Sequence, residues 1–491
     1  MMHAVRGLGV AATLAFVFSL AGAPQARAQS TAAYVYIQIQ GPAGAVYGYS
    51  ANSSGQLTAI PGSPFKPGTQ IIGSNKAEFL TMGKTLIHSY AVGSNGAIGS
   101  QLSQIPFLDY AGSSCGGGTN GLAGGVLDHS GQYIYVLLEN GGDGSCAAYQ
   151  TYKINSGGTF TFDGDTEENF GQQSGPNFAS VDLPSILGNE SFAYADESSG
   201  HLSSPIGFRR ESSGTLEAMQ FSETDPSLGG STGNYDVEYP DASPTGNYVV
   251  FQLYPYNSNP PQLGSYTVDS QGNLSTTNTS SNMPTSALGG PYSTFSPDGK
   301  MFAFYANAND GVGNPGNGIE IYNFNGAAPL TLYKTLLTGT PIDQVAWDSS
   351  NHLYAISTHL NKLYVFTVTS TSVTQDTTFS IGSPWSMVVV SEAATGGGGS
   401  CAVPTSNGVN VCSPASDATV TSPVQISAAA TVSGGVYRLE LWSGGKKLLS
   451  SDNGTMDQSL SLAPGTYKLT FDAYNSTKSS HEYATRDITV K

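Results

Sequence analysis

Positively charged side chains are scarce in this sequence. It contains 18 Lys and Arg against 35 Asp and Glu, and only 11% of its residues are charged. Proteins that bind nucleic acid or anionic membranes need a basic surface, so this balance argues against both kinds of partner. The abundant Gly, Ser, Thr, Asn and Tyr instead suit short strands joined by tight turns, which predicts an all-β fold.

Long apolar segments are also lacking, with one exception at the N-terminus. Met1 to Arg6 is positively charged, Gly7 to Ala23 is mostly apolar, and Ala26-Arg27-Ala28 has the small-x-small pattern of a cleavage site. The apolar run is shorter than the roughly 20 residues that span a membrane. We therefore expect residues 1–28 to be a signal peptide. The mature chain would then be secreted, as an extracellular, periplasmic or cell-surface protein with no transmembrane segment. Without Arg6 and Arg27 it keeps 16 basic and 35 acidic side chains, a formal charge of −19.

Cysteine is rare as well. Four cysteines in an exported chain predict disulfides, with three possible connectivities. Cys115 and Cys146 are near each other in sequence, as are Cys401 and Cys412, so we expect pairing within each set. No cysteine has a Cys-x-x-Cys partner or a neighbouring histidine, so we expect no metal site at these residues.

The motifs of common catalytic sites are missing. There is no Gly-x-Ser-x-Gly, no His-Glu-x-x-His and no phosphate-binding glycine loop, and we expect no cofactor. The acidic run Asp163 to Glu168 is interpreted as a solvated turn, with calcium binding as the alternative, although it departs from the twelve-residue calcium loop. His129 and His352 are expected to be solvated turn residues. Arg209 and Arg210 should point to opposite faces of a strand, so at most one reaches a given site.

A unit that recurs seven times dominates the rest of the chain. Each copy is an aromatic strand, a polar turn that usually contains Gly, and a hydrophobic residue, and the copies end at Leu57, Ile98, Phe160, Leu216, Leu274, Leu330 and Val373. These spacings suit four-stranded blades with variable loops. Trp385 to Val390 resembles an innermost strand without a unit after it, and the first copy, from Tyr34, lacks such a strand before it. Joining the two ends closes a ring, which predicts a seven-bladed β-propeller over residues 34–391. A β-helix or two sandwiches would give similar strand density but would not explain this complementarity.

The unit order and the turn Ser296-Pro-Asp-Gly-Lys300 resemble the lactonase-type seven-bladed propeller family, which includes 6-phosphogluconolactonases. The resemblance implies the propeller fold and a ring-opening site with Arg, His and Glu side chains on one face. Glu139 matches the position of a functional glutamate of the family, so it is the candidate catalytic residue. The Arg-His pair that commonly precedes the turn in the family is replaced here by Gly290-Pro291-Tyr292.

A second unit occupies the C-terminus. Residues 392–400 include four consecutive glycines and are interpreted as a flexible linker. Short alternating strands beyond it predict a small β-sandwich over residues 401–491. Segments such as Leu462-Ala-Pro-Gly-Thr-Tyr-Lys-Leu469 resemble bacterial immunoglobulin-like modules, and this resemblance implies a spacer or attachment element.

The ends of the second strands of the blades should gather on one face of a propeller, around the central channel. Reading these positions along the sequence gives the ligand-binding candidates Glu139, Asn140, Asp196, Glu197, Tyr254, Asn307 and His359. Such side chains bond sugar hydroxyls or attract cations. The alternative is that Asn, Asp and Tyr occupy these positions because they suit turns.

Three functional hypotheses follow. The first is a secreted binding module that holds a small molecule or glycan at the propeller face, with the immunoglobulin-like part as a spacer. The second is an extracellular lactone hydrolase, and the third is a structural envelope protein. A phosphorylated lactone is the least favoured substrate, because the strong negative charge attracts anions poorly.

Overall fold

The computed structural model describes most of the chain after residue 30. The described residues are 31–40, 44–68, 70–107, 120–140, 147–168, 179–199, 202–219, 235–255, 261–286, 288, 292–306, 316–391, 401, 403–404, 406–416, 418–420, 424–451, 454–460 and 462–491. Their secondary structure consists of strands, turns and bends without a helix, as predicted. In particular, this part of the chain has no helix long and apolar enough to cross a membrane. The expected signal peptide and the glycine linker lie outside the described residues.

The strands described between Thr31 and Ser391 form seven sheets. From the innermost strand outward, they are β29 (Pro384–Ser391), β1 (Thr31–Ile39), β2 (Val46–Asn52) and β3 (Leu57–Ala59); β4 (Gln70–Ser74), β5 (Glu78–Met82), β6 (Leu86–Val92) and β7 (Ile98–Pro106); β8 (Asn120–Leu127), β9 (Tyr133–Asn140), β10 (Ala147–Ile154) and β11 (Phe160–Glu168); β12 (Ala179–Val181) with β13 (Ser185–Ile186), then β14 (Phe192–Ser199), β15 (Leu202–Arg210) and β16 (Leu216–Met219); β17 (Tyr235–Ala242), β18 (Tyr248–Pro255), β19 (Gln262–Val268) and β20 (Leu274–Ser275); β21 (Tyr292–Phe295), β22 (Met301–Ala306), β23 (Gly318–Asn323) and β24 (Thr331–Leu336); and β25 (Gln344–Trp347), β26 (His352–Ser357), β27 (Lys362–Val368) and β28 (Val373–Ser380).

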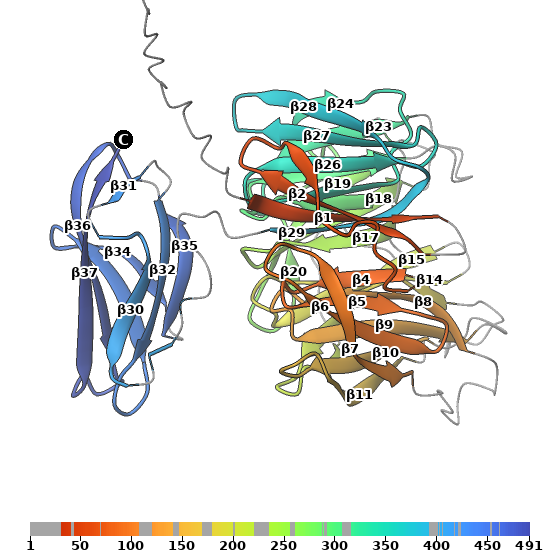
Figure 1. The fold of residues 1–491 in the computed structure, drawn as a ribbon. Helices are drawn as coiled ribbons and strands as arrows, with labels where there is room; N and C mark the ends of the chain where they lie inside the picture. Colours follow the sequence, from red (N-terminus) through yellow and green to blue (C-terminus); the bar gives the residue numbers. More distant parts are fainter. Residues whose placement is uncertain are drawn as a thin grey trace, which may run out of the picture.

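These sheets are arranged as a ring. The innermost strands make contacts in sequence from β29 to β4 and β8, and from β13 through β17, β21 and β25 back to β29. The remaining contact, between β8 and β13, is made by His129 just after β8. Its Nε2 atom lies 2.7 Å from the backbone oxygen of Ile186 in β13. Figure 1 shows the sheets gathered into one body, with β29 beside β1. A ring of radially arranged antiparallel sheets is a β-propeller.

One sheet is completed by both ends of this part of the chain. β29 pairs antiparallel with β1, so that Val390 faces Tyr34 and Val388 faces Tyr36. This pairing removes the free edges that an open array would expose. The prediction that the segment around Trp385 supplies the missing strand of the first unit is confirmed.

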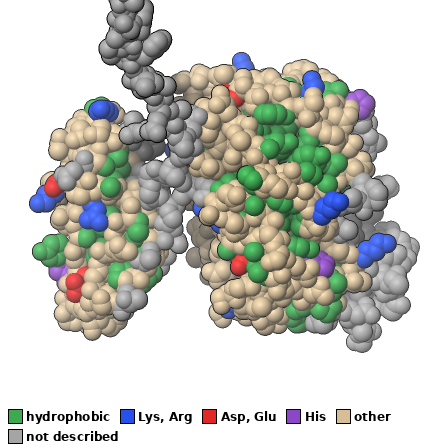
Figure 2. Space-filling model, in the orientation of Figure 1, with side chains coloured by type: hydrophobic (Ala, Val, Ile, Leu, Met, Phe, Trp, Pro, Cys, Tyr) green, Lys and Arg blue, Asp and Glu red, His purple; other side chains and the backbone are tan. Residues whose placement is uncertain are grey.

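Position within a sheet explains the hydrophobic pattern of each strand. Every residue of the second strands β22 and β26 is buried, because each sheet is packed between two neighbours. The outer strand β24 is largely exposed. The face in Figure 2 shows few charged side chains among hydrophobic and uncharged ones, in keeping with the low charged fraction.

The repeated glycine lies in the turn between the third and fourth strands of a blade. At Gly96 the backbone φ is +78°, and a Cβ atom there would overlap the ring of Tyr34 in the preceding blade. The hydroxyl of Tyr36 donates to the Gly96 carbonyl at 2.8 Å. Tyr135 and Tyr194 make the same bond to Gly214 and Gly272, both at 2.7 Å. The glycine is therefore required by its backbone conformation and by the contact between blades.

Arg210 joins two blades through ionic contacts. Its Nη2 atom lies 2.8 Å from Asp128 Oδ2, Nη1 contacts Glu190, and the guanidinium lies 4.8 Å from the ring centroid of Tyr133. Arg209 is exposed, so the two arginines do point to different surroundings, as expected from strand alternation. Arg210 has a structural role in the contact between the third and fourth blades.

Two expectations were wrong. His352 is buried rather than solvated: it is 1% exposed, its Nδ1 lies 2.7 Å from Asp348 Oδ2, and it packs near Gly55 of the first blade. His352 is the first residue of strand β26 and not a turn residue, and the Asp348 carboxylate and the packing against Gly55 of the next blade explain its burial. Asp163 to Glu168 belongs to strand β11 and not to a turn, because β10 pairs along that whole segment as far as Glu168.

The C-terminal strands form a two-sheet sandwich. One sheet has the order β30 (Gly408–Ser413), β32 (Val424–Thr431) and β35 (Thr455–Leu460), and the other has β31 (Ala418–Val420), β37 (His481–Val490), β36 (Gly465–Tyr474), β33 (Arg438–Ser443) and β34 (Lys446–Ser451). Side chains such as Ile426, Leu441 and Phe471 form the core between them. The predicted disulfide between Cys401 and Cys412 is present. Cys115 and Cys146 lie outside the described residues, so their pairing stays a prediction.

Candidate functional site

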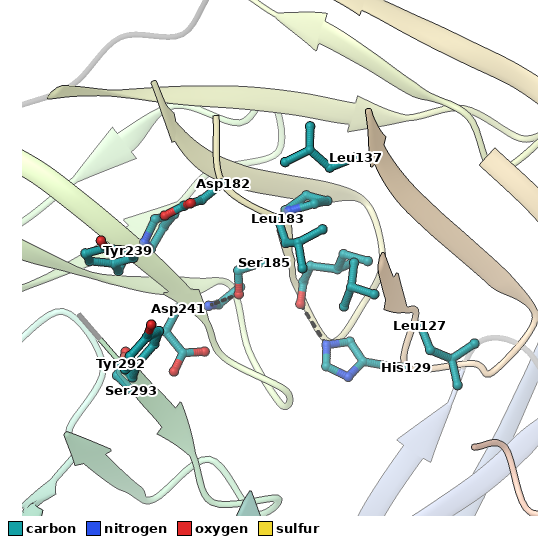
Figure 3. Close-up of a pocket in the computed structure, with 15 residues that line it drawn as sticks. Leu127, His129, Leu137, Asp182, Leu183, Ser185, Tyr239, Asp241, Tyr292 and Ser293 are labelled. Carbon is teal, nitrogen blue, oxygen red and sulfur yellow. Dashed lines mark hydrogen bonds between the residues drawn. The ribbon is translucent and has the colours of Figure 1, made fainter. Parts of the chain in front are cut away.

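A cavity of about 630 Å³ lies among the inner strands of four consecutive blades. Its walls come from the end of β8, the segment around β13, the second half of β17 and the start of β21 (Figure 3). The lining residues are Val126, Leu127, His129, Leu137, Asp182, Leu183, Pro184, Ser185, Ile186, Tyr239, Pro240, Asp241, Ala242, Tyr292 and Ser293. Its volume is in the range of small-molecule sites.

Two prolines interrupt the inner strands that face this cavity. Asp182 to Pro184 separates β12 from β13, and Tyr239-Pro240 forms a bulge at which the pairing of β17 with β18 shifts register. Proline cannot donate to a sheet ladder, so both interruptions follow from the sequence. Tyr239 has a φ of +47°, a strained value for a residue with a side chain. These irregularities turn side chains of the inner strands toward the cavity.

Asp182 and Asp196 form a carboxyl pair at one end of the cavity. Their side chains hydrogen-bond to each other, and Asp196 Oδ1 also accepts from the backbone N–H of Tyr239 at 3.1 Å. Burial, then the charge of Asp182, raises the pKa of Asp196 well above its usual range, and burial also raises the pKa of Asp182. Two carboxyl groups that hydrogen-bond to each other share a proton more readily than they both ionise.

Asp241 is the third carboxyl group of the cavity. Burial raises its pKa to about 7, even though a hydrogen bond from Ser293 lowers it. Its Oδ2 atom is shielded from solvent and has no hydrogen-bond partner among the described residues. In Figure 3, Asp241 lies beside Tyr292 and Ser293, and Asp182 lies beside Tyr239.

Three tyrosines accompany these acids. The rings of Tyr292 and Tyr305 stack with centroids 5.4 Å apart, and the ring of Tyr239 lies 6.2 Å from that of Tyr292. Tyr305 is buried, whereas 44% of Tyr292 is exposed. Burial raises the pKa of both Tyr239 and Tyr305, and nearby carboxylates raise it further, so both hydroxyls stay protonated at neutral pH.

Positive charge is sparse around the cavity. The lining residues that the structure describes contain no Lys or Arg, and their one histidine, His129, lies across the cavity from Asp182 and Tyr239 (Figure 3). No three His, Cys, Asp or Glu side chains of the described part are grouped so that they could hold a metal ion. The arrangement therefore offers carboxyl groups, hydroxyls and aromatic faces.

The structure describes the backbone of six of the seven candidates from sequence. Glu139, Asn140 and Tyr254 lie at the ends of second strands, His359 follows one, and Asp196 and Glu197 lie within the second strand β14. Asp196 is 5% exposed and contacts the cavity residues Asp182 and Tyr239. The hydroxyl of Tyr254 donates to Gln252 Oε1 at 3.2 Å, and His359 is exposed. Asn307 and the side chains of Glu139, Asn140 and Glu197 lie outside the described part, so their roles stay predictions.

Sequence reasoning did not select Asp182, Tyr239 and Asp241. One usable signal was the combination of proline with acidic or aromatic residues in an inner strand, as in Asp182-Leu-Pro184 and Tyr239-Pro-Asp241. Tyr292 was noted only as the residue that stands where the resemblance would place an Arg-His pair. The structure places Tyr292 in the cavity wall.

Comparisons with known proteins agree with this architecture. Residues 408–483 match the bacterial Ig domain family. No curated protein matches the chain in sequence. Among solved structures, a candidate 6-phosphogluconolactonase of Bacteroides uniformis aligns over 74% of this chain and 100% of its own, with 14% identity and a TM-score of 0.53. The corresponding values for the periplasmic gluconolactonase of Pseudomonas aeruginosa are 73%, 99%, 13% and 0.52. At such identities the likeness shows the fold alone, that of the 6-phosphogluconolactonase-like propellers.

Proposed function

We propose that this chain is a secreted binding protein whose propeller channel holds a polyhydroxylated small molecule or glycan. The observation that carries the proposal is that Tyr292, which is 44% exposed, lines one cavity together with Asp182 and Asp241. An aromatic face packs against the apolar side of a sugar ring, and carboxyl oxygens accept bonds from its hydroxyls. The immunoglobulin-like sandwich would act as a spacer or attachment element.

The charge of the site supports an uncharged or positively charged ligand. The described lining has two acids, Asp182 and Asp241, and no Lys or Arg, and Asp196 is hydrogen-bonded to Asp182. The whole chain has a formal charge of −17. Such a field repels anions before they reach the cavity. Phosphorylated sugars and sugar acids are therefore disfavoured as ligands.

Secretion is supported by two observations. The disulfide between Cys401 and Cys412 persists in oxidising compartments and is rare in the cytosol. The first 28 residues have the charge, apolar run and cleavage pattern of a signal peptide. Both fit an extracellular, periplasmic or cell-surface location.

A lactone hydrolase is the second candidate, and Asp241 is the observation that favours it. A pKa of about 7 suits a general base that activates water at neutral pH. The developing oxyanion, however, needs a cation or several donors, and the described lining offers only hydroxyls and His129. We therefore expect slow hydrolysis, if Glu139 and Asp241 support any.

The test is a glycan array followed by calorimetric titration of the best ligand, with a pH-stat assay on unphosphorylated sugar lactones in parallel. Tyr292→Ala should weaken binding about fivefold, since an aromatic contact contributes roughly 1 kcal/mol. Tyr437→Ala is the matched control, because Tyr437 is similarly exposed, at 49%, but lies in the sandwich. Fast lactone turnover abolished by Glu139→Gln or Asp241→Asn would establish the hydrolase instead. Absence of both activities would leave the structural envelope protein.

A further inference from the structure

The channel cavity contains an unusual excess of acidic groups around aromatic rings. Asp182, Asp196 and Asp241 lie at or directly behind its wall, and Glu238 adds a further negative charge near Asp196 and Tyr239. Tyr239 and Tyr292 contribute neighbouring rings to the same wall. Carboxylates and tyrosine faces both attract positive charge.

The carboxyl group of Asp241 indicates, independently of the acidic charge, that the ligand carries a hydrogen-bond donor. Its Oδ2 atom is buried without a hydrogen-bond partner in the described part of the chain, although the residue lines the cavity. An unsatisfied buried carboxyl oxygen is costly, and such a group in a folded protein calls for a donor that the protein alone does not provide. A ligand N–H in the cavity would provide it.

The stacked rings of Tyr292 and Tyr305 form an aromatic surface beside Asp241. Tyr305 lies against Tyr292 with its ring plane only 20° from parallel, which holds the Tyr292 ring in place, and 44% of Tyr292 is exposed. A cation over a tyrosine ring within about 6 Å of its centroid gains electrostatic energy, and more when it is shielded from water. The same cation can donate to the neighbouring Asp241.

Alternative cations and neutral donors fit less well. A metal ion needs several protein ligands at once, and the described residues group no three suitable side chains. A neutral hydroxyl would satisfy one acceptor but would not compensate the carboxyl charges. The competing protein cation, Arg210, is already engaged by Asp128 and Glu190 outside this cavity.

We infer that the channel recognises an ammonium group, and that its ligand is an amine-bearing glycan in which a free amine contacts Asp241 and the Tyr292 ring. This inference rests on the proposed binding function and narrows it to amino sugars that are not N-acylated. Asp182 and Asp196 lie at the other end of the acidic wall and would accept hydroxyls of a neighbouring sugar unit.

The test compares three tetrasaccharides that share a backbone and differ at one position: glucosamine, N-acetylglucosamine and glucose tetramers. At pH 7.5 and moderate salt, titration of the full chain should show the glucosamine tetramer binding about tenfold or more tightly than the other two. Asp241→Asn should remove that advantage, and Asp182→Asn should reduce it in part. Asp487→Asn, which removes one exposed charge from the sandwich, should leave all three affinities unchanged. Circular dichroism of each variant controls for folding.

The outcomes separate this inference from the proposed function. Neutral tetramers that bind as tightly as the glucosamine tetramer would overturn the ammonium inference and leave the binding function standing. The inference is equally overturned if the glucosamine tetramer does not bind, or if Asp241→Asn folds normally and binds all three as the wild type does. In the case of no binding, the glycan array decides the wider proposal separately.

Discussion

The backbone N–H of Asp182 donates to the backbone carbonyl of Asp196, with 3.3 Å between the nitrogen and the oxygen, and the carboxyl groups of the same residues hydrogen-bond to each other. The two residues come from the interrupted inner strand and the second strand of one blade. This double contact fixes the acidic wall of the cavity next to Tyr239.

The carboxyl pair predicts a pH dependence of stability. Because the pKa of Asp196 is raised in the folded state, the folded chain binds more protons than the unfolded chain above pH 4, and stability falls as pH rises through that window. Asp196→Asn mimics the protonated acid, so its melting temperature at pH 7.5 should exceed that of the wild type by about 2–4 °C. The gain should shrink toward pH 4. Thermal melts at several pH values, with Asp487→Asn as control, would contradict the pairing if both variants behaved alike.

Asp241 should titrate near neutrality. Burial raises its pKa to about 7, and the hydrogen bond from Ser293 lowers it, so Ser293→Ala should raise that pKa further. The other titratable residues that line this cavity are Asp182, His129, Tyr239 and Tyr292, and Tyr305 adjoins it. A carbon-13 NMR titration of labelled aspartate carboxyls would detect the midpoint. A normal aspartate midpoint, or no change in Ser293→Ala, would show that the carboxyl is not held as described.

The turn glycine Gly96 should be needed for packing as well as for its backbone angle. Gly96 and Gly157 both have φ of +78°, but only at Gly96 would a Cβ atom overlap a neighbouring ring, that of Tyr34. Gly157→Ala should cost about 1–2 kcal/mol from the positive φ alone. Gly96→Ala should cost about 1–3 kcal/mol more, because of the overlap. If Gly96→Ala and Gly157→Ala were equally destabilised in thermal or urea unfolding, the overlap with Tyr34 would not contribute to stability.

The two adjacent arginines should differ sharply in their effect on stability. Arg210→Ala leaves the fully buried carboxylate of Asp128 without its ion partner, and such a loss costs about 3–5 kcal/mol. Arg209→Ala, at an exposed position, should change stability by less than about 0.5 kcal/mol. Unfolding experiments on both variants measure the difference, which would vanish if Arg210 did not bridge the blades.

The repeat made the fold predictable, while the cavity depended on irregularities. The turn glycines, such as Gly96, mark most blades because packing demands them, and the complementary chain ends near Tyr34 and Trp385 predicted the closure. Asp196 was selected because second strands recur at regular positions in the repeat, although it lies within β14 and not at its end. Tyr239 and Asp241 escaped because a one-residue register shift decides which side chains face the channel, and periodicity does not reveal such shifts. His352 was misjudged because it begins strand β26 and packs against the next blade, a contact that the local sequence does not show.

A crystal structure of the full chain soaked with the tightest-binding oligosaccharide tests the central claim most directly. We predict sugar density in the channel cavity, with one ring on the face of Tyr292 and a polar ligand atom within hydrogen-bond distance of Asp241. Sugar bound elsewhere, for example on the exposed Tyr437 or Tyr483 of the sandwich, with the channel cavity empty, would contradict the account.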